Sequence, residues 1–231
     1  FSIKATERLI FYMVQRQLEN VAVDKSTILE RWLEERKSDL LVISGTSIIK
    51  SLDPVIIAPY LNLVQKEYLV YKSFTVISAE GPILYHSLGK TAGKDVKNFP
   101  GSFTVKDQMD ISNIYHSDIV KEYVFNIATP IYDENSRLIG TVYGTIGTNQ
   151  IIELILTVSL GKTGECYLVD KAGAFLAHKE PSRILNENIS QTKSFENIFA
   201  QKDIKKTYLD YRGIEVLGAS KKIGGTDWYL V

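Results

Sequence analysis

The sequence predicts an α+β fold in which a long N-terminal helix forms a spine for two tandem modules, each built on an antiparallel sheet. Three observations predict this architecture. A helical pattern runs without interruption from Ile3 to Ser44, an alternation typical of strands begins at Phe74, and the chain repeats itself after Phe74 at an offset of 92 residues. The 231 residues suit two domains of roughly 100 each.

The N-terminal pattern is long enough to limit its possible roles. It contains neither Gly nor Pro, and its apolar residues mostly recur three or four positions apart. At about 1.5 Å per residue such a helix spans roughly 60 Å, about twice the width of a small domain. A helix of that length is a coiled coil, a membrane span or a shared spine. Charged residues such as Arg31 and Glu35 exclude the membrane span.

Capping and turn residues divide the rest of the first half. Asp53 and Pro54 predict the start of a second helix that runs to about Leu69. The segment 90–110 contains Gly and Pro and is expected to be a loop that covers a functional site. Period-two alternation predicts strands at 74–79, 83–87, 111–117, 122–131 and 137–147, followed by a helix at 149–160.

The second half follows the same plan. Strands are expected at 164–170, 174–179, 206–210, 215–222 and 226–231, with a short helix at 194–201. The order of strand, Gly turn, strand, loop and hairpin matches that of the first half. We therefore expect the N-terminal helices at 1–72, a first module at 73–150 and a second at 151–231. The matched positions are Gly81 with Gly173, Leu84 with Leu176, His86 with His178, and Pro130-Ile131 with Lys222-Ile223.

Composition excludes several classes of protein. Lys plus Arg and Asp plus Glu both number 27, so the formal net charge is zero and the basic surface of a nucleic-acid-binding protein is not expected. Cys166 is the single cysteine, which rules out an internal disulfide. The sequence contains no run of about 18 apolar residues, so no membrane span is predicted.

Motifs for catalysis, metals and cofactors are not found. Gly161-Lys-Thr163 resembles the end of a phosphate-binding loop, but Leu156 stands where that loop requires Gly. The three histidines lack metal-ligand spacing. No signature of a nucleophile or a zinc hydrolase is present. We expect no catalytic residue, no metal site and no cofactor, and a free-standing enzyme is the less favoured hypothesis.

Several segments resemble the double Cache family of sensor domains. They are Trp32-Leu-Glu-Glu-Arg36, Pro130-Ile-Tyr-Asp133 with Leu138-Ile-Gly140, and the segment from Gly161 to Gly173. The resemblance implies two PAS-like modules on a long helix, in the extracytoplasmic part of a prokaryotic membrane protein anchored by flanking helices. It also implies a small-molecule ligand in the membrane-distal module, here 73–150. The stretch from Trp32 to Ile43 favours a sensor histidine kinase; a chemoreceptor or a cyclic-di-GMP enzyme is the alternative.

The chain departs from the amino-acid-binding branch of that family. That branch carries Arg-x-Trp-Tyr in the cover loop and Asp in the last distal strand. Here the loop contains Lys97-Asn-Phe-Pro-Gly-Ser-Phe103, and Thr145 stands at the position of the Asp. The anchors for a carboxylate and an ammonium group are therefore missing, and the ligand's identity stays open.

The last hairpin of the first module predicts the ligand site. Its polar residues alternate with apolar ones, so they share the sheet face away from the spine helix. If Tyr132 pairs with Arg137, Asn126 lies opposite Tyr143, whereas a shift of one residue brings in Phe125. These groups favour a small, uncharged or singly charged ligand; an ordinary half-exposed sheet face is the alternative. The predicted ligand-binding residues are Phe103, Asp107, Tyr115, Asn126, Thr141, Tyr143 and Thr145.

Two further expectations concern the second module and the helix. Tyr167, Tyr208 and Tyr211 allow a second site, but the shorter loop favours a structural role. Apolar positions such as Met13 and Val21 predict a homodimer through the N-terminal helix. A dimerisation module without any ligand is the third hypothesis.

Overall fold

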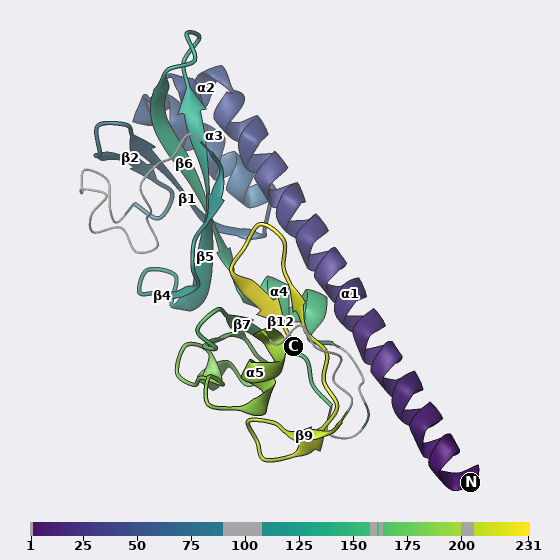
Figure 1. The fold of residues 1–231 in the computed structure, drawn as a ribbon. Coiled ribbons are helices and arrows are strands. Elements are labelled where there is room, and N and C mark those ends of the chain that lie inside the picture. The colour runs from purple at the N-terminus through teal and green to yellow at the C-terminus, as the bar shows by residue number, and fades with distance from the viewer. Residues whose placement is uncertain (1, 90–107, 158–160, 162–163, 200–205) are drawn as a thin grey trace. The chain divides into compact units, whose positions relative to one another are not determined.

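The computed structural model describes residues 2–89, 108–157, 161, 164–199 and 206–231 (Figure 1). The chain divides into two compact units. One comprises Phe1–Arg31 with Ile151–Val231, and the other comprises Trp32–Gln150. The first is called the split unit below and the second the central unit. The architecture confirms the predicted mixture of one long helix and antiparallel sheets.

The predicted N-terminal helix is one continuous helix, α1 (Ser2–Gly45), which contributes to both units. In the central unit the Trp32 ring packs edge-on against Phe125 with 6.4 Å between ring centroids. In the split unit the Glu30 carboxylate accepts a hydrogen bond of 2.7 Å from the Gly224 backbone N–H. Leu29 and Leu33 are buried within the stripe that the apolar spacing predicted.

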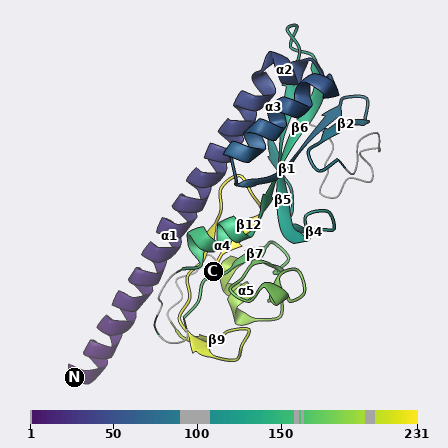
Figure 2. The ribbon, with the colours of Figure 1, turned by 180° about the vertical axis from the view of Figure 1, so that it is seen from behind.

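The central unit joins two short helices to a six-stranded antiparallel sheet (Figures 1 and 2). α3 (Pro54–Glu67) begins as predicted, because the Asp53 carboxylate accepts a hydrogen bond from the Val55 N–H at 2.9 Å. The strand order is β2-β1-β6-β5-β3, and β4 also pairs with β5. The remaining elements are α2 (Ser47–Lys50), β1 (Tyr71–Ser78), β2 (Ile83–His86), β3 (Asp110–Ile111), β4 (Tyr115–Ser117), β5 (Glu122–Tyr132) and β6 (Leu138–Gly147).

The two faces of this sheet differ in what covers them. Phe74, Val76, Val142 and Ile146 share one face with Phe125, which packs against Trp32 of α1. Gly144 belongs to the same face, since a Cβ there would lie 2.7 Å from the Tyr71 ring and 3.2 Å from Leu40. The single strand expected at 111–117 is instead two, β3 and β4.

The split unit has shorter strands than predicted. A four-stranded sheet has the order β11-β12-β7-β8, and β9 and β10 form a separate pair. The strand expected at 215–222 is interrupted, because only its two ends are paired. The elements are α4 (Asn149–Ile155), β7 (Leu168–Asp170), β8 (Phe175–Ala177), the 3-10 helix η2 (Pro181–Arg183), α5 (Lys193–Phe199), β9 (Tyr208–Leu209), β10 (Glu215–Val216), β11 (Lys221–Lys222) and β12 (Trp228–Leu230).

The strand register confirms the predicted repeat in the hairpins β1–β2 and β7–β8. The β1–β2 and β7–β8 hairpins pair equivalent residues and shift register at the same place. Gly81 and Gly173 both have positive φ, 111° and 86°, which favours glycine in each turn. The equivalent pairs are Val76 opposite Tyr85 with Leu168 opposite Ala177, and Ile77 opposite Ile83 with Val169 opposite Phe175.

The repeated histidines make the same local hydrogen bond. His86 Nδ1 accepts from the Leu88 N–H at 3.1 Å, and His178 Nδ1 accepts from the Glu180 N–H at 2.9 Å. In both hairpins the imidazole therefore fixes the backbone where the second strand ends. An accepting Nδ1 also assigns the proton of the neutral ring to Nε2.

Candidate functional site

The polar residues of β6 lie on the sheet face opposite the helices in the central unit. Residues directly opposite each other in an antiparallel pair share a face. Tyr143 lies between Thr75 on β1 and Ala128 on β5, and Thr145 lies opposite Asn126. The expected pairing of Asn126 with Tyr143 is therefore wrong by two residues.

Asn126 nevertheless lies on the predicted face, because the register differs by two shifts of one residue. The Asp133 N–H bonds to the Arg137 carbonyl, so Asp133 rather than Tyr132 lies opposite Arg137. A bulge between Ile131 and Tyr132 adds the second shift. Each shift alone would turn Asn126 to the helices, and the two together restore its face.

Asn126 is held by polar partners on three sides. Its Oδ1 accepts a hydrogen bond of 2.9 Å from the Thr145 hydroxyl, and its Nδ2 lies 3.2 Å from the Tyr115 hydroxyl. Its backbone N–H donates to the Ser112 hydroxyl at 2.8 Å. The Asn126 side chain is fully buried. This network fixes the orientation of the amide and brings together three of the predicted residues.

Tyr143 and two threonines form the middle of the face. The Tyr143 ring is fully buried and packs with Ile77, Ile83 and Ala128. Burial raises the pKa of its phenol to about 12, so the group is a neutral hydrogen-bonding hydroxyl at physiological pH. Within the described part of the chain, the buried hydroxyls of Thr75 and Thr141 have no hydrogen-bond partner. Each unsatisfied group costs about 1–3 kcal/mol.

The remaining predicted residues have different outcomes. Tyr115 reaches the face from β4 through its bond to Asn126. Phe103 and Asp107 lie outside the described residues, as do Lys97 and Lys106. Thr75 was not predicted. It interrupts an apolar strand and falls on the polar side by alternation, which is the signal that could have identified it.

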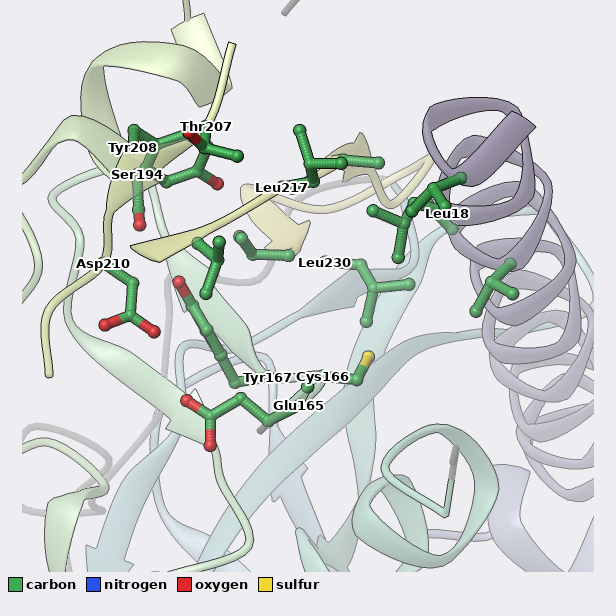
Figure 3. Close-up of a pocket in the computed structure, with 18 of the residues that line it drawn as sticks. Leu18, Glu165, Cys166, Tyr167, Ser194, Thr207, Tyr208, Asp210, Leu217 and Leu230 are labelled. Carbon is green, nitrogen blue, oxygen red and sulfur yellow. The ribbon is translucent and has the colours of Figure 1, made fainter. Parts of the chain in front are cut away.

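The split unit contains a cavity of about 380 Å³ (Figure 3). One wall is apolar and consists of Leu18 on α1 with Leu217 and Leu230. Tyr208, Ser194 and Thr207 cluster at the opposite side, and the Tyr167 hydroxyl points toward them. A Cβ on Gly218 would lie 1.9 Å from the Tyr208 hydroxyl, so that phenol lies directly against the backbone.

A charge network centred on the buried Glu165 borders this cavity. The Glu165 carboxylate is 5% exposed and lies 3.0 Å from Lys179 Nζ and 3.3 Å from an Arg212 nitrogen. Arg212 also binds Asp210 at 2.6 Å. The negative charges of Glu165 and Asp210 are therefore balanced by the positive charges of Lys179 and Arg212.

His178 extends the network through Tyr211. His178 Nε2 lies 2.7 Å from the Tyr211 hydroxyl, which in turn donates to Glu165. Burial lowers the pKa of His178, although the charge of Glu165 opposes this effect. Burial and the bond to Glu165 raise the pKa of Tyr211. Both rings are therefore neutral and connect Glu165 to the end of β8.

The repeat explains the position of the cavity. In the central unit Gly144–Gly147 of β6 pair with Val124–Ile127 of β5. At the offset of 92, these β5 positions correspond to 216–219, which line the cavity. The cavity is therefore lined by the equivalents of residues that pair with β6 in the central unit. We place the candidate site on the polar face of the central unit.

The described residues show neither a metal-binding cluster nor a membrane-spanning helix. Within 2–89, 108–157, 161, 164–199 and 206–231, no three His, Cys, Asp or Glu side chains are grouped to hold a metal ion. No helix in the same part of the chain combines the length and apolarity needed to cross a membrane.

Comparisons with known proteins agree with the fold. The model of a Cache domain family, of the double Cache type, matches residues 3–231. No curated protein matches the chain. The extracellular domain of the putative histidine kinase rpHK1S-Z16 superposes with a TM-score of 0.72 at 13% identity, over 95% of this chain and 93% of that one.

Chemoreceptor domains superpose almost as well. The ligand-binding domain of CtaA from Pseudomonas fluorescens, solved with L-serine, has a TM-score of 0.69 at 15% identity, over 95% of this chain and 96% of that one. The corresponding domain of PctC from Pseudomonas aeruginosa PAO1, solved with GABA, gives 0.68 at 14% identity, over 94% and 97%. Identities this low support a shared fold.

Proposed function

Because this chain belongs to the Cache domain family, a family of ligand-binding sensor modules, we propose that it is the extracytoplasmic sensor domain of a prokaryotic membrane receptor. The ligand is a small molecule that binds to the polar face of the central unit. The observation that carries this proposal is the buried cluster of Asn126, Thr141, Tyr143 and Thr145 on one face of a rigid sheet. Phe103, Asp107 and Tyr115 complete the proposed binding residues.

The relatives support a small-molecule ligand without identifying it. CtaA and PctC were solved with L-serine and GABA. Amino acids carry a carboxylate and an ammonium group, which need charged partners. Thr145, at the position expected for the branch's Asp, instead donates its hydroxyl to Asn126. We therefore do not extend the amino-acid ligand to this chain.

Signalling follows from a shift in population. A ligand that binds one conformation of the domain better than another increases the population of that conformation. Since α1 packs within both units, such a change displaces the helix that connects the domain to the rest of the receptor. The domain performs no chemistry in this mechanism.

The proposed parent is a sensor histidine kinase, and a chemoreceptor or a cyclic-di-GMP enzyme is the alternative. The structural relatives include both a putative kinase and chemoreceptors at TM-scores of 0.72 and 0.69. The resemblance over Trp32 to Ile43 favours the kinase. Incubation of the intact receptor with ATP tests the kinase proposal. A histidine kinase phosphorylates itself under these conditions, whereas a chemoreceptor does not.

We also propose that two copies associate through α1. Leu9, Tyr12 and Met13 are all more than half exposed on this helix. Val21, expected on the same surface, instead lines the cavity of the split unit. Sedimentation should show a concentration-dependent dimer that Met13→Glu weakens. A strict monomer at high concentration would contradict this proposal for the isolated domain.

A thermal-shift screen with small metabolites tests the binding function. A ligand at 100 times its Kd should stabilise the domain by about 2.7 kcal/mol. Tyr143→Ala and Asn126→Ala should each weaken a confirmed hit, while Leu63→Ala on the exposed side of α3 should not. A hit that binds both site variants with unchanged affinity refutes the assigned face. If no metabolite binds, the hypothesis of a dimerisation module without ligand gains support.

A further inference from the structure

The polar face of the central unit is uncharged at its centre. Three rows cross the sheet there: Ser73–Thr145–Asn126, Thr75–Tyr143–Ala128 and Ile77–Thr141–Pro130. The middle row continues to His86 on β2 at one edge and to Asp110 on β3 at the other. On β1, β6 and β5 the described residues of these rows therefore offer hydroxyl and amide groups, and the charge in line with them is the Asp110 carboxylate at the β3 edge.

Two of these hydroxyls have no hydrogen-bond partner among the residues that the structure describes. Thr75 and Thr141 are at most 1% exposed, and neither Oγ1 makes a hydrogen bond. They lie on neighbouring strands, diagonally across from each other beside Tyr143. Asn126 and Thr145, by contrast, bond to each other at 2.9 Å. On this face, the described buried hydroxyls without a partner are those of Thr75 and Thr141.

We propose that Thr75 and Thr141 are ligand-anchoring residues and that the ligand is an uncharged molecule bearing hydroxyl or amide groups. This inference rests on the proposed function of the same face. A hydroxyl can donate and accept at once, so two threonines can bind a neutral polar group without a charged partner. A carboxylate placed on these rows would be desolvated without a counterion from them, which is costly. The face therefore selects against anions.

The test uses two matched sets of small metabolites as probes. One set contains polyols, sugars and primary amides; the other contains carboxylates, amines and amino acids. We expect titration calorimetry to find binding in the uncharged set. Thr75→Val and Thr141→Val should each raise the Kd of that probe about 3- to 10-fold. Thr75→Ser, which retains the hydroxyl, should bind nearly as well as the parent.

Thr129→Val is the matched control. Thr129 is also fully buried, and its hydroxyl also has no partner, but it lies opposite Val142 on the helix-facing side. Its replacement should leave the Kd unchanged. Val matches the shape of Thr, and thermal unfolding without ligand checks that each variant is folded.

The outcomes separate this inference from the proposed function. If only charged probes bind and Asn126→Ala abolishes their binding, the face is a ligand site but the uncharged class is wrong. If a neutral probe binds and Thr75→Val and Thr141→Val both leave its Kd unchanged, the anchoring role is wrong. If no probe from either set binds, both this inference and the proposed function are refuted.

Discussion

The two repeated hairpins have the same backbone but different surroundings. Each places a histidine at the end of its second strand, and each histidine accepts the same hydrogen bond from the residue two positions later. In the central unit the strand beside His86 carries the neutral Thr75. In the split unit His178 is joined through Tyr211 to the buried Glu165. One backbone thus supports a neutral surface in one unit and an internally paired charge cluster in the other.

This difference indicates a division of roles. Charges that satisfy each other are held in place and are poorly available to a ligand, whereas unpaired hydroxyls can accept a new partner. The split unit is therefore expected to be the more rigid of the two around its histidine. In the proposed function, the unsatisfied hydroxyls of the central unit bind the ligand.

The largest expected effect is from the charge cluster. Glu165→Ala removes the anion that Lys179, Arg212 and Tyr211 share, and should lower the free energy of unfolding by about 1.5–3 kcal/mol. Urea unfolding measures it. Glu187→Ala, which removes an exposed carboxylate, is the control and should cost less than about 1 kcal/mol. A loss of similar size in both variants would show that the cluster has no special role.

The two faces of the central sheet should differ in how well they tolerate an added methyl group. Gly144→Ala places a Cβ against the Tyr71 ring and Leu40 and should cost about 1–3 kcal/mol. Gly147→Ala meets only flexible Lys72 and Glu122 side-chain atoms and should cost less. Thermal unfolding of both variants checks the expected order. Equal losses would mean that the helix-facing side is not tightly packed.

Lowering the pH should destabilise the folded protein through both His86 and His178. Burial lowers the pKa of His86 and His178 in the folded protein, so the folded state favours the neutral ring. This contribution to stability is complete above the unfolded pKa of about 6.5 and is lost as the pH falls toward the folded pKa. Protonation of Nδ1 also removes the bond to the backbone N–H.

His178→Asn provides the matched variant for the pH dependence. An Asn side chain can still accept from the N–H two residues later, but it does not titrate. The melting temperature of His178→Asn should fall less between pH 7 and pH 5 than that of the parent. Proton NMR of both histidines should give pKa values below 6.5. An unperturbed pKa at either position contradicts the prediction there.

The smallest expected effect is at Tyr115. Tyr115→Phe removes the hydroxyl that lies 3.2 Å from Asn126 Nδ2 and should cost about 1 kcal/mol. Chemical denaturation measures it, and Tyr12→Phe on the exposed part of α1 is the neutral control. No difference between the two would mean that Tyr115 does not help to hold Asn126.

Much of the fold follows from local pattern. The apolar spacing of α1, the Asp53 cap and the Gly turns depend on residues a few positions apart, and the helix, the cap and the repeated turns form where they were predicted. The alternation along β6 placed Thr141, Tyr143 and Thr145 on one face. Thr75 was missed because its strand is otherwise apolar, although alternation also determines its side.

Strand register and the pairing of side chains from distant segments could be established only from the tertiary structure. The hairpin turn and the bulge at Ile131 together decide that Asn126 lies opposite Thr145, and a bulge leaves no reliable mark in the sequence. Glu165 finds its partners at Lys179, Tyr211 and Arg212, which are distant along the chain. The sequence by itself determined the spine helix, the two repeats and the polar face, because those depend on short-range periodicity. Only the folded chain decided which charges neutralise each other and which hydroxyls stay unpaired, because those depend on contacts between distant segments.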